Sequence, residues 1–237
     1  MRVWDIHPGY LNRQSLLGEH QELHALLTIV EEGRRGYAHH PETRRWREHL
    51  HALRLRHEMV VAEMRLRGYR HQSPVTVGEP FHWPESFVDP PARQFALLEE
   101  KYRGKEPGRI PLPRSTQELW AQHKYSVLAR DPARYRTLGQ SLAGPGGEAP
   151  FADLALDLVR LLRQPPSPGG VRNALEHMWG YVRQEGTPFP DGLQEPRVLL
   201  AAIQERAVRG GVRYLLESTA LSDLAVWLDL APDATAP

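Results

Sequence analysis

The stretch that decides the fold is MRVWDIHPGYLNRQSLLGEHQELHALLTIVEEG, residues 1–33. Its apolar residues recur at helical spacing, at Leu16, Leu23, Leu27 and Val30. Gly33 is suited to the left-handed position that commonly ends a helix. We therefore predict an amphipathic helix over residues 14–32. Two aromatic residues and a His-Pro step precede it, which indicates that the first residues are held in place rather than loose.

A second helical pattern begins at Pro41, a favourable first-turn residue, and ends at Gly68. We predict one continuous helix over this range. Its expected buried side carries Trp46, Leu50, Leu53, His57, Val60 and Met64. A different side carries mostly cations, namely Arg47, His51, Arg54 and Arg65, together with Glu58. Prolines then interrupt residues 73–91, and a short helix is expected near residues 92–102.

The segment GKEPGRIPLPR, residues 104–114, has the composition of a linker. Directly after it, Ser115 and Glu118 form a capping box, which predicts a new helix start. We therefore expect two domains, residues 1–114 and 115–237. The second is predicted to contain about six helices separated by turn clusters such as residues 144–150 and 164–170. Nothing alternates long enough to form a sheet, so the predicted fold class is all-α.

Composition excludes several kinds of chemistry. The 237 residues contain no cysteine, which rules out disulfides, thiolate metal sites and a cysteine nucleophile. No signal-peptide pattern is evident, and no apolar run approaches the ~18 residues that span a bilayer. We expect a soluble cytoplasmic protein with no membrane partner.

The net charge of +1 is unevenly divided. Residues 1–114 carry 18 Lys and Arg against 15 Asp and Glu, and the remainder carries 12 against 14. Between Arg34 and Arg70, ten arginines face four glutamates. Arginine suits forked recognition of phosphate, so this stretch is a candidate nucleic-acid surface, although a solvated helix face is the simpler interpretation.

Glu22 is the carboxylate that stands out in the first domain. We expect it to share a helix face with Ser15 and Glu19, away from the apolar side. A held N-terminus, a helical carboxylate about twenty residues later and an arginine-rich second helix together indicate a site for an anionic polymer.

The opening residues resemble a known family. Met1, Arg2, Trp4, His7, Pro8, Tyr10 and Leu11 match the pattern M-R-x-W-x-x-H-P-x-Y-L of pyrimidine dimer DNA glycosylases of the phage endonuclease V type, in particular their cellular branch. A second pattern, G-Y-x-x-H-P, is matched by Gly36, Tyr37, His40 and Pro41. The similarity covers roughly residues 1–110. It implies an all-helical enzyme that excises a damaged base through its own α-amino group and then cuts the strand as an AP lyase.

The resemblance also implies roles for individual residues. The nucleophile is the α-amine of Met1, because Arg at position 2 is too bulky for the usual removal of the initiator methionine. An ordinary α-amine has a pKa near 7.7–8.0 and is roughly a tenth to a fifth neutral at pH 7, whereas lysine is far less so. Glu22 takes the position of the family's catalytic carboxylate. The implied partner is damaged double-stranded DNA, and no cofactor and no metal are implied.

For DNA contact we select Arg2, Gln21, Arg47, His51, Arg54 and Arg65. Ser15 and Gln21 depart from the family by replacing a His and an Arg that contribute to catalysis and DNA contact in the phage enzyme. The resemblance therefore supports glycosylase and lyase chemistry better than it supports specificity for pyrimidine dimers.

The second domain is similar to the YbgA-type domain of unknown function. The matching residues are His123, Lys124, Tyr125, Tyr135, Asn173, His177 and Tyr181. We expect most of them to be core and helix-contact positions, with a DNA or lesion contact as the functional alternative.

Two other functions stay open. His20 and His24 stand four residues apart, a spacing that can hold zinc, and His40, His51 or His57 could complete a site for a metal-dependent nuclease or hydrolase. The second alternative is a DNA-binding adaptor without catalytic activity.

Overall fold

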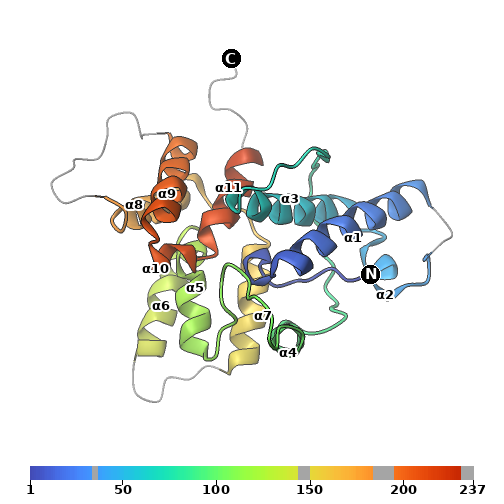
Figure 1. Ribbon diagram of the computed structural model, residues 1–237, viewed down its shortest axis with the longest axis horizontal. Helices are drawn as coiled ribbons and strands as arrows, with labels where there is room; N and C mark the ends of the chain where they lie inside the picture. The colour runs from blue at the N-terminus through green and yellow to red at the C-terminus, as the bar shows by residue number, and fades with distance from the viewer. Residues whose placement is uncertain (34–36, 144–149, 184–194, 231–237) are drawn as a thin grey trace. The chain divides into compact units, whose positions relative to one another are not determined.

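The computed structural model describes residues 1–33, 37–143, 150–183 and 195–230 (Figure 1). Throughout these ranges the chain forms helices and connecting segments without a strand, which confirms the all-α prediction. The chain divides into two compact units, Met1–Leu112 and Pro113–Pro237. Gly36 of the second family pattern and residues 144–149 of one expected turn cluster lie outside the described residues.

The described residues of the first unit form one 3-10 helix and four α-helices. They are η1 (Pro8–Tyr10), α1 (Arg13–Glu32), α2 (Pro41–Trp46), α3 (Leu50–Leu66) and α4 (Pro91–Lys101). The helices α1 and α3 pack side by side and form the centre of the unit (Figure 1). No helix in the described ranges is both long and apolar enough to cross a membrane.

The helix α1 confirms the first prediction to within one residue. Asn12 caps its start, because its side chain accepts a hydrogen bond from the Ser15 amide at 2.9 Å. Gly33 ends it with φ 62°, the left-handed conformation that glycine adopts without strain. Leu16, Leu23 and Leu27 are buried as expected.

The prediction of one continuous helix from Pro41 to Gly68 is wrong. The chain leaves the helical path at His49, where φ is −124° and ψ is 38°, so that α2 and α3 are separate. No glycine or proline marks this break. The reason is tertiary: α2 buries Glu42, Arg45 and Trp46, and it does so independently of the face that α3 packs on α1.

The side of α1 that carries Ser15, Glu19 and Glu22 differs in burial from one residue to the next. Ser15 and Glu19 are buried, whereas Glu22 is partly exposed. The N-terminal segment covers this side of α1, since the Trp4 amide donates a hydrogen bond to Glu19 Oε1 at 3.0 Å. The N-terminal segment therefore gives α1 a second buried side.

The second unit contains seven helices within the described ranges, one more than expected. They are α5 (Thr116–Leu128), α6 (Pro132–Ala143), α7 (Phe151–Leu162), α8 (Pro168–Trp179), α9 (Pro196–Gly210), α10 (Arg213–Leu216) and α11 (Ala220–Leu230). The helix α5 contacts α6, α7, α8 and α11, so it is central to this unit. Ser115 caps α5 by accepting a hydrogen bond from the Glu118 amide at 3.1 Å, as the capping box predicts.

Candidate active site at the N-terminus

The first atom of the chain lies beside a carboxylate. The Met1 amine is 3.6 Å from Glu22 Oε1, and the two side chains are 5% and 39% exposed. The Thr43 hydroxyl lies 3.9 Å from Met1 Sδ, so the methionine side chain is anchored on α2. Figure 1 shows the N-terminus next to this helix. The amine and Glu22 therefore form a pair that solvent reaches from the Glu22 side.

Buried acceptors hold the extended residues that follow Met1. The Val3 amide donates to Glu42 Oε1 at 3.3 Å, and the Trp4 amide donates to Glu19 Oε1 at 3.0 Å. Gln94 Oε1 accepts from the Asp5 amide at 2.8 Å. An extended segment has no internal hydrogen-bond partners for its amides. The side chains therefore accept hydrogen bonds from buried amides that would otherwise be unpaired, at a cost in free energy.

Glu19 also forms a two-pronged ion pair with Arg56 on α3. The guanidinium nitrogens Nε and Nη2 lie 2.9 and 3.0 Å from the two carboxylate oxygens, and Nη1 donates to the Ile6 carbonyl at 3.0 Å. Burial raises the pKa of Glu19, and Arg56 opposes that rise. The pair joins α1, α3 and the N-terminal segment in one buried network.

A second network forms around Glu42 on α2. Arg45 contacts Asp5 and lies 3.3 Å from Glu42 Oε2, and the Trp46 indole donates to the same oxygen at 3.1 Å. Burial raises the pKa of Glu42, with Arg45 opposing the rise. This network orients Glu42, which accepts the hydrogen bond from the Val3 amide.

A third network fixes the turn at η1. Glu63 on α3 pairs with Arg67 at 2.7 Å and with Arg109 at 2.7 Å, and Arg67 Nη1 donates to the Leu11 carbonyl at 2.8 Å. Burial alone would raise the pKa of Glu63, but Arg109 and Arg67 outweigh it and lower the pKa to about 2.

Sequence reasoning missed these networks. Arg45 and Arg56 belong to the arginine-rich stretch that was a candidate DNA surface, yet both are buried. The usable signal was weak: Arg56 and Glu63 stand next to apolar core positions on α3, but a single sequence does not distinguish a buried ion pair from a solvated face.

The residues selected for DNA contact differ in their surroundings. Gln21 follows His20 on the exposed side of α1, and Arg65 is exposed on α3. Arg47 is exposed and donates to the Ala38 carbonyl at 3.1 Å. Arg2 pairs with Asp89 at 2.6 Å and lies over the Trp4 ring.

Two of the residues selected for DNA contact already interact with other parts of the first unit. Arg54 pairs with Glu31 at 2.8 Å, which offsets its charge. The ring of His51 packs against the backbone of Gly78, where an added Cβ would lie 2.6 Å from its Nδ1 atom. His51 is half-buried against the segment after α3, and its part in DNA contact stays a prediction.

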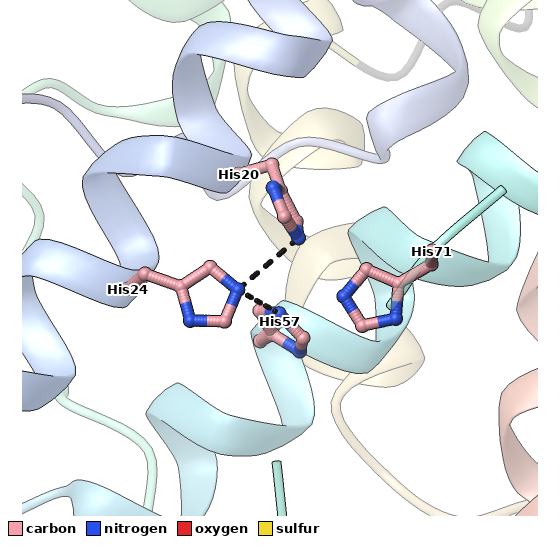
Figure 2. Close-up of side chains that lie close together, drawn as sticks. All are labelled: His20, His24, His57 and His71. Carbon is pink, nitrogen blue, oxygen red and sulfur yellow. Dashed lines mark hydrogen bonds between the residues drawn. The ribbon is translucent and has the colours of Figure 1, made fainter. Parts of the chain in front are cut away.

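The structure brings together four histidines, of which the sequence indicated three. His20 and His24 on α1 face His57 on α3 and His71 in the segment after α3 (Figure 2). The candidates His40 and His51 are elsewhere, since His40 caps α2 and His51 faces Gly78. Burial, followed by the charges of the neighbouring rings, lowers the pKa of His20 to about 4.

The matched residues of the second unit fall into two groups. His123 and Tyr125 are buried on α5, and His123 Nδ1 lies 2.9 Å from the Leu119 carbonyl. Lys124 lies over the rings of Tyr125 and Tyr214, and Tyr181 is 49% exposed. Burial lowers the pKa of Lys124. Part of this set is core, as expected, and part is open to solvent.

Comparison with known proteins gives family matches for part of each unit. No curated protein and no solved structure matches the chain. Residues 124–189 match the family described as protein of unknown function (DUF1722), within the segment that resembles the YbgA-type domain. Residues 1–77, which include Met1, Glu22 and the four histidines, match the family described as pyrimidine dimer DNA glycosylase.

Proposed function

We propose that the protein is a DNA repair glycosylase with AP lyase activity, which acts on a pyrimidine dimer or a related lesion through the α-amine of Met1. The observation that carries this proposal is the 3.6 Å distance between the Met1 amine and Glu22 Oε1 in a segment that matches the pyrimidine dimer glycosylase family. We further propose residues 1–114 as the glycosylase domain and residues 115–237 as a separate YbgA-like domain.

The first step is attack of the neutral amine on C1′ of the damaged nucleotide. A bond forms between the amine nitrogen and C1′ as the glycosidic bond breaks, and the base leaves with the bonding electrons and gains a proton. The ionised carboxylate of Glu22 stabilises the positive charge that develops on the sugar. Because Glu22 is partly exposed while Met1 is anchored, the reacting carbon can approach from the Glu22 side.

The second step cuts the strand. The amine nitrogen loses a proton, the C1′–O4′ bond breaks, and O4′ takes up a proton as the sugar ring opens, which gives a protonated Schiff base with C1′. This cation acidifies the C2′ hydrogen, and its removal expels the 3′ phosphate by β-elimination. Glu22 is the nearest carboxylate to the amine in the described residues and would move these protons. Hydrolysis of the Schiff base then regenerates the free amine.

Positioning supports the use of a terminal amine. The networks around Glu19, Glu42 and Glu63 hold residues 3–11 against α1, α2 and α3, so the amine is fixed without a long side chain. A fixed nucleophile has less conformational freedom to lose on reaching the transition state than a lysine on a flexible stem.

Binding of the duplex is proposed to use the exposed arginines of the first unit. Arg47 and Arg65 are exposed on the described surface, and Gln21 adjoins Glu22 on α1. Access to C1′ within a duplex needs a flipped or kinked nucleotide, which costs a few kcal/mol that phosphate contacts can offset.

Borohydride trapping tests the proposal directly. The full-length, untagged protein is incubated with duplexes containing an abasic site or a cyclobutane dimer, with borohydride present to reduce the Schiff base. We expect a covalent adduct that peptide mapping assigns to the amine of Met1. An adduct on Lys101 or Lys124, no adduct at all, or full activity of protein that retains an uncleaved N-terminal tag would refute it. Absence of an adduct with retained DNA affinity would favour the adaptor instead.

A further inference from the structure

Four imidazole rings meet on the first unit in an arrangement that the proposed lyase chemistry does not use. His20 and His24 come from adjacent turns of α1, His57 from the middle of α3, and His71 from the segment after α3. Figure 2 shows the four rings around one centre, and we call them the His cluster. Within the His cluster, His57 is fully buried, and His20, His24 and His71 are half-buried.

The spacing of the ring nitrogens matches that of ligands around one ion. One nitrogen from each ring lies within 4.8 Å of every other. His24 Nε2 is 3.3 Å from His20 Nε2 and 3.0 Å from His57 Nε2. In a tetrahedral site with metal–nitrogen bonds of ~2.0–2.1 Å, the ligand nitrogens stand roughly 3.3–3.4 Å apart. Small rotations of half-buried rings close the remaining difference.

Hydrogen bonding alone accounts poorly for this convergence. His24 Nε2 lies within 3.3 Å of three polar atoms, which are His20 Nε2, His57 Nε2 and the hydroxyl oxygen of Ser73. An imidazole nitrogen carries either one hydrogen or one lone pair, so it makes one good hydrogen bond in the ring plane. Lone pairs directed at a shared cation satisfy several such nitrogens at once.

Glu58 provides the outer partner that metal-binding histidines usually have. Its Oε1 atom lies 2.8 Å from His57 Nδ1. The carboxylate accepts the Nδ1 hydrogen, which leaves the Nε2 lone pair directed at the other rings. A carboxylate behind a histidine also supplies negative charge to a site whose four ligands are neutral.

We propose that His20, His24, His57 and His71 form a binding site for a divalent transition-metal ion of the zinc class. Imidazole nitrogens are ligands that suit such ions, and the chain has no cysteine to compete for them. Four protein nitrogens complete a tetrahedron and leave no open position, which is typical of a structural site rather than a hydrolytic one. The ion would join α1, α3 and the start of the segment after α3.

The site is separate from the Met1 and Glu22 pair. Glu22 stands two residues from both His20 and His24 on α1, and two residues correspond to a turn of about 200° around the helix. The metal proposal therefore does not rest on the glycosylase proposal, and either can fail alone.

Zinc titration of the full-length, untagged and chelator-stripped protein tests the site. We expect about one zinc ion per chain by elemental analysis, and cobalt(II) should give the intense visible bands of tetrahedral coordination. His71→Ala should lower zinc affinity by more than about 100-fold, and Glu58→Gln by about 10- to 100-fold. His177→Ala changes an exposed histidine of α8 and should leave affinity unchanged.

Trypsin cleavage provides a readout of the structural role. Arg70 is exposed directly before His71. Zinc should slow cleavage after Arg70 several-fold in the unsubstituted chain and leave it unchanged in the chain carrying His71→Ala. Circular dichroism of the chains carrying His71→Ala and Glu58→Gln would test whether each variant is folded.

The proposal is overturned by substoichiometric zinc, by an octahedral cobalt spectrum, or by equal affinity in the chain with His71→Ala. Should the His71→Ala variant unfold, the Glu58→Gln variant decides the matter. Zinc affinity equal to that of the unsubstituted chain would then overturn the proposal, because Glu58 would not support a metal-binding His57.

Discussion

Replacement of Glu22 by glutamine separates chemistry from folding at the N-terminus. The side chain is 39% exposed and its described polar contact is the Met1 amine at 3.6 Å. An exposed pair of this kind contributes about 0–1 kcal/mol, and glutamine keeps the shape, so the free energy of unfolding should change by no more than about 0.5 kcal/mol. A positioned acid or base contributes roughly 10²- to 10⁴-fold in rate, or about 3–5 kcal/mol of barrier.

Glu31→Gln is the matched control. Glu31 lies on the same helix, is also 39% exposed and pairs with Arg54 rather than with the amine. Both variants should unfold at nearly the wild-type urea concentration. Under single-turnover conditions, only Glu22→Gln should slow base excision and strand cleavage on dimer and abasic duplexes by about 10²-fold or more.

Two results would refute this reasoning. One is near-normal excision and cleavage by the protein with Glu22→Gln, which would leave Glu22 as surface decoration. The other is a rate loss that follows a loss of folded protein. The DNA affinity of the Glu22→Gln protein should equal or slightly exceed that of the wild type, since a negative charge near phosphate has been removed.

Three further predictions concern the buried networks and the DNA surface. Glu19→Ala should lower the free energy of unfolding by about 3–5 kcal/mol in urea, because it leaves the buried Arg56 guanidinium without its carboxylate; a loss under about 1 kcal/mol would contradict the network. The pKa of Glu63 is about 2, below the 4.5 of an unfolded glutamate, so its stabilisation is complete above pH 4.5 and is lost as the pH falls toward 2. Unfolding free energies measured from pH 5 to 2 should therefore fall more steeply for the wild type than for Glu63→Gln, and parallel curves would rule this out. Arg47→Ala and Arg65→Ala should each shallow the salt dependence of duplex binding by about one unit, and an unchanged slope would make that face a solvated one.

Much of the fold follows from local signals in the chain. Leu16, Leu23 and Leu27 specify one face of α1, Asn12 and Gly33 cap it, and Ser115 starts α5. These signals act over three or four residues, which is the range of helical hydrogen bonds, so they are visible without any knowledge of packing. The break between α2 and α3 carries no such signal, since it depends on which side chains of α2 are buried.

The candidate active site is only partly visible in the same way. The family resemblance singles out Met1 and Glu22, but their 3.6 Å separation depends on how the N-terminal segment lies against α1. The buried carboxylates of Glu19 and Glu42 read as ordinary surface charges in the sequence, because the groups that bury and satisfy them come from distant parts of the chain. The Trp4 and Val3 amides donate to these carboxylates, and Arg56 pairs with Glu19.

The His cluster shows the same division between local and long-range information. His20 and His24 are recognisable as a pair because four residues make about one helical turn. His57 is brought to them by the packing of α3 on α1, and His71 by the path of the segment after Gly68. The local sequence pattern determines where each helix forms. Side chains that are distant in the sequence meet only when the apolar faces of the helices pack together, and this packing brings the four residues of the His cluster together.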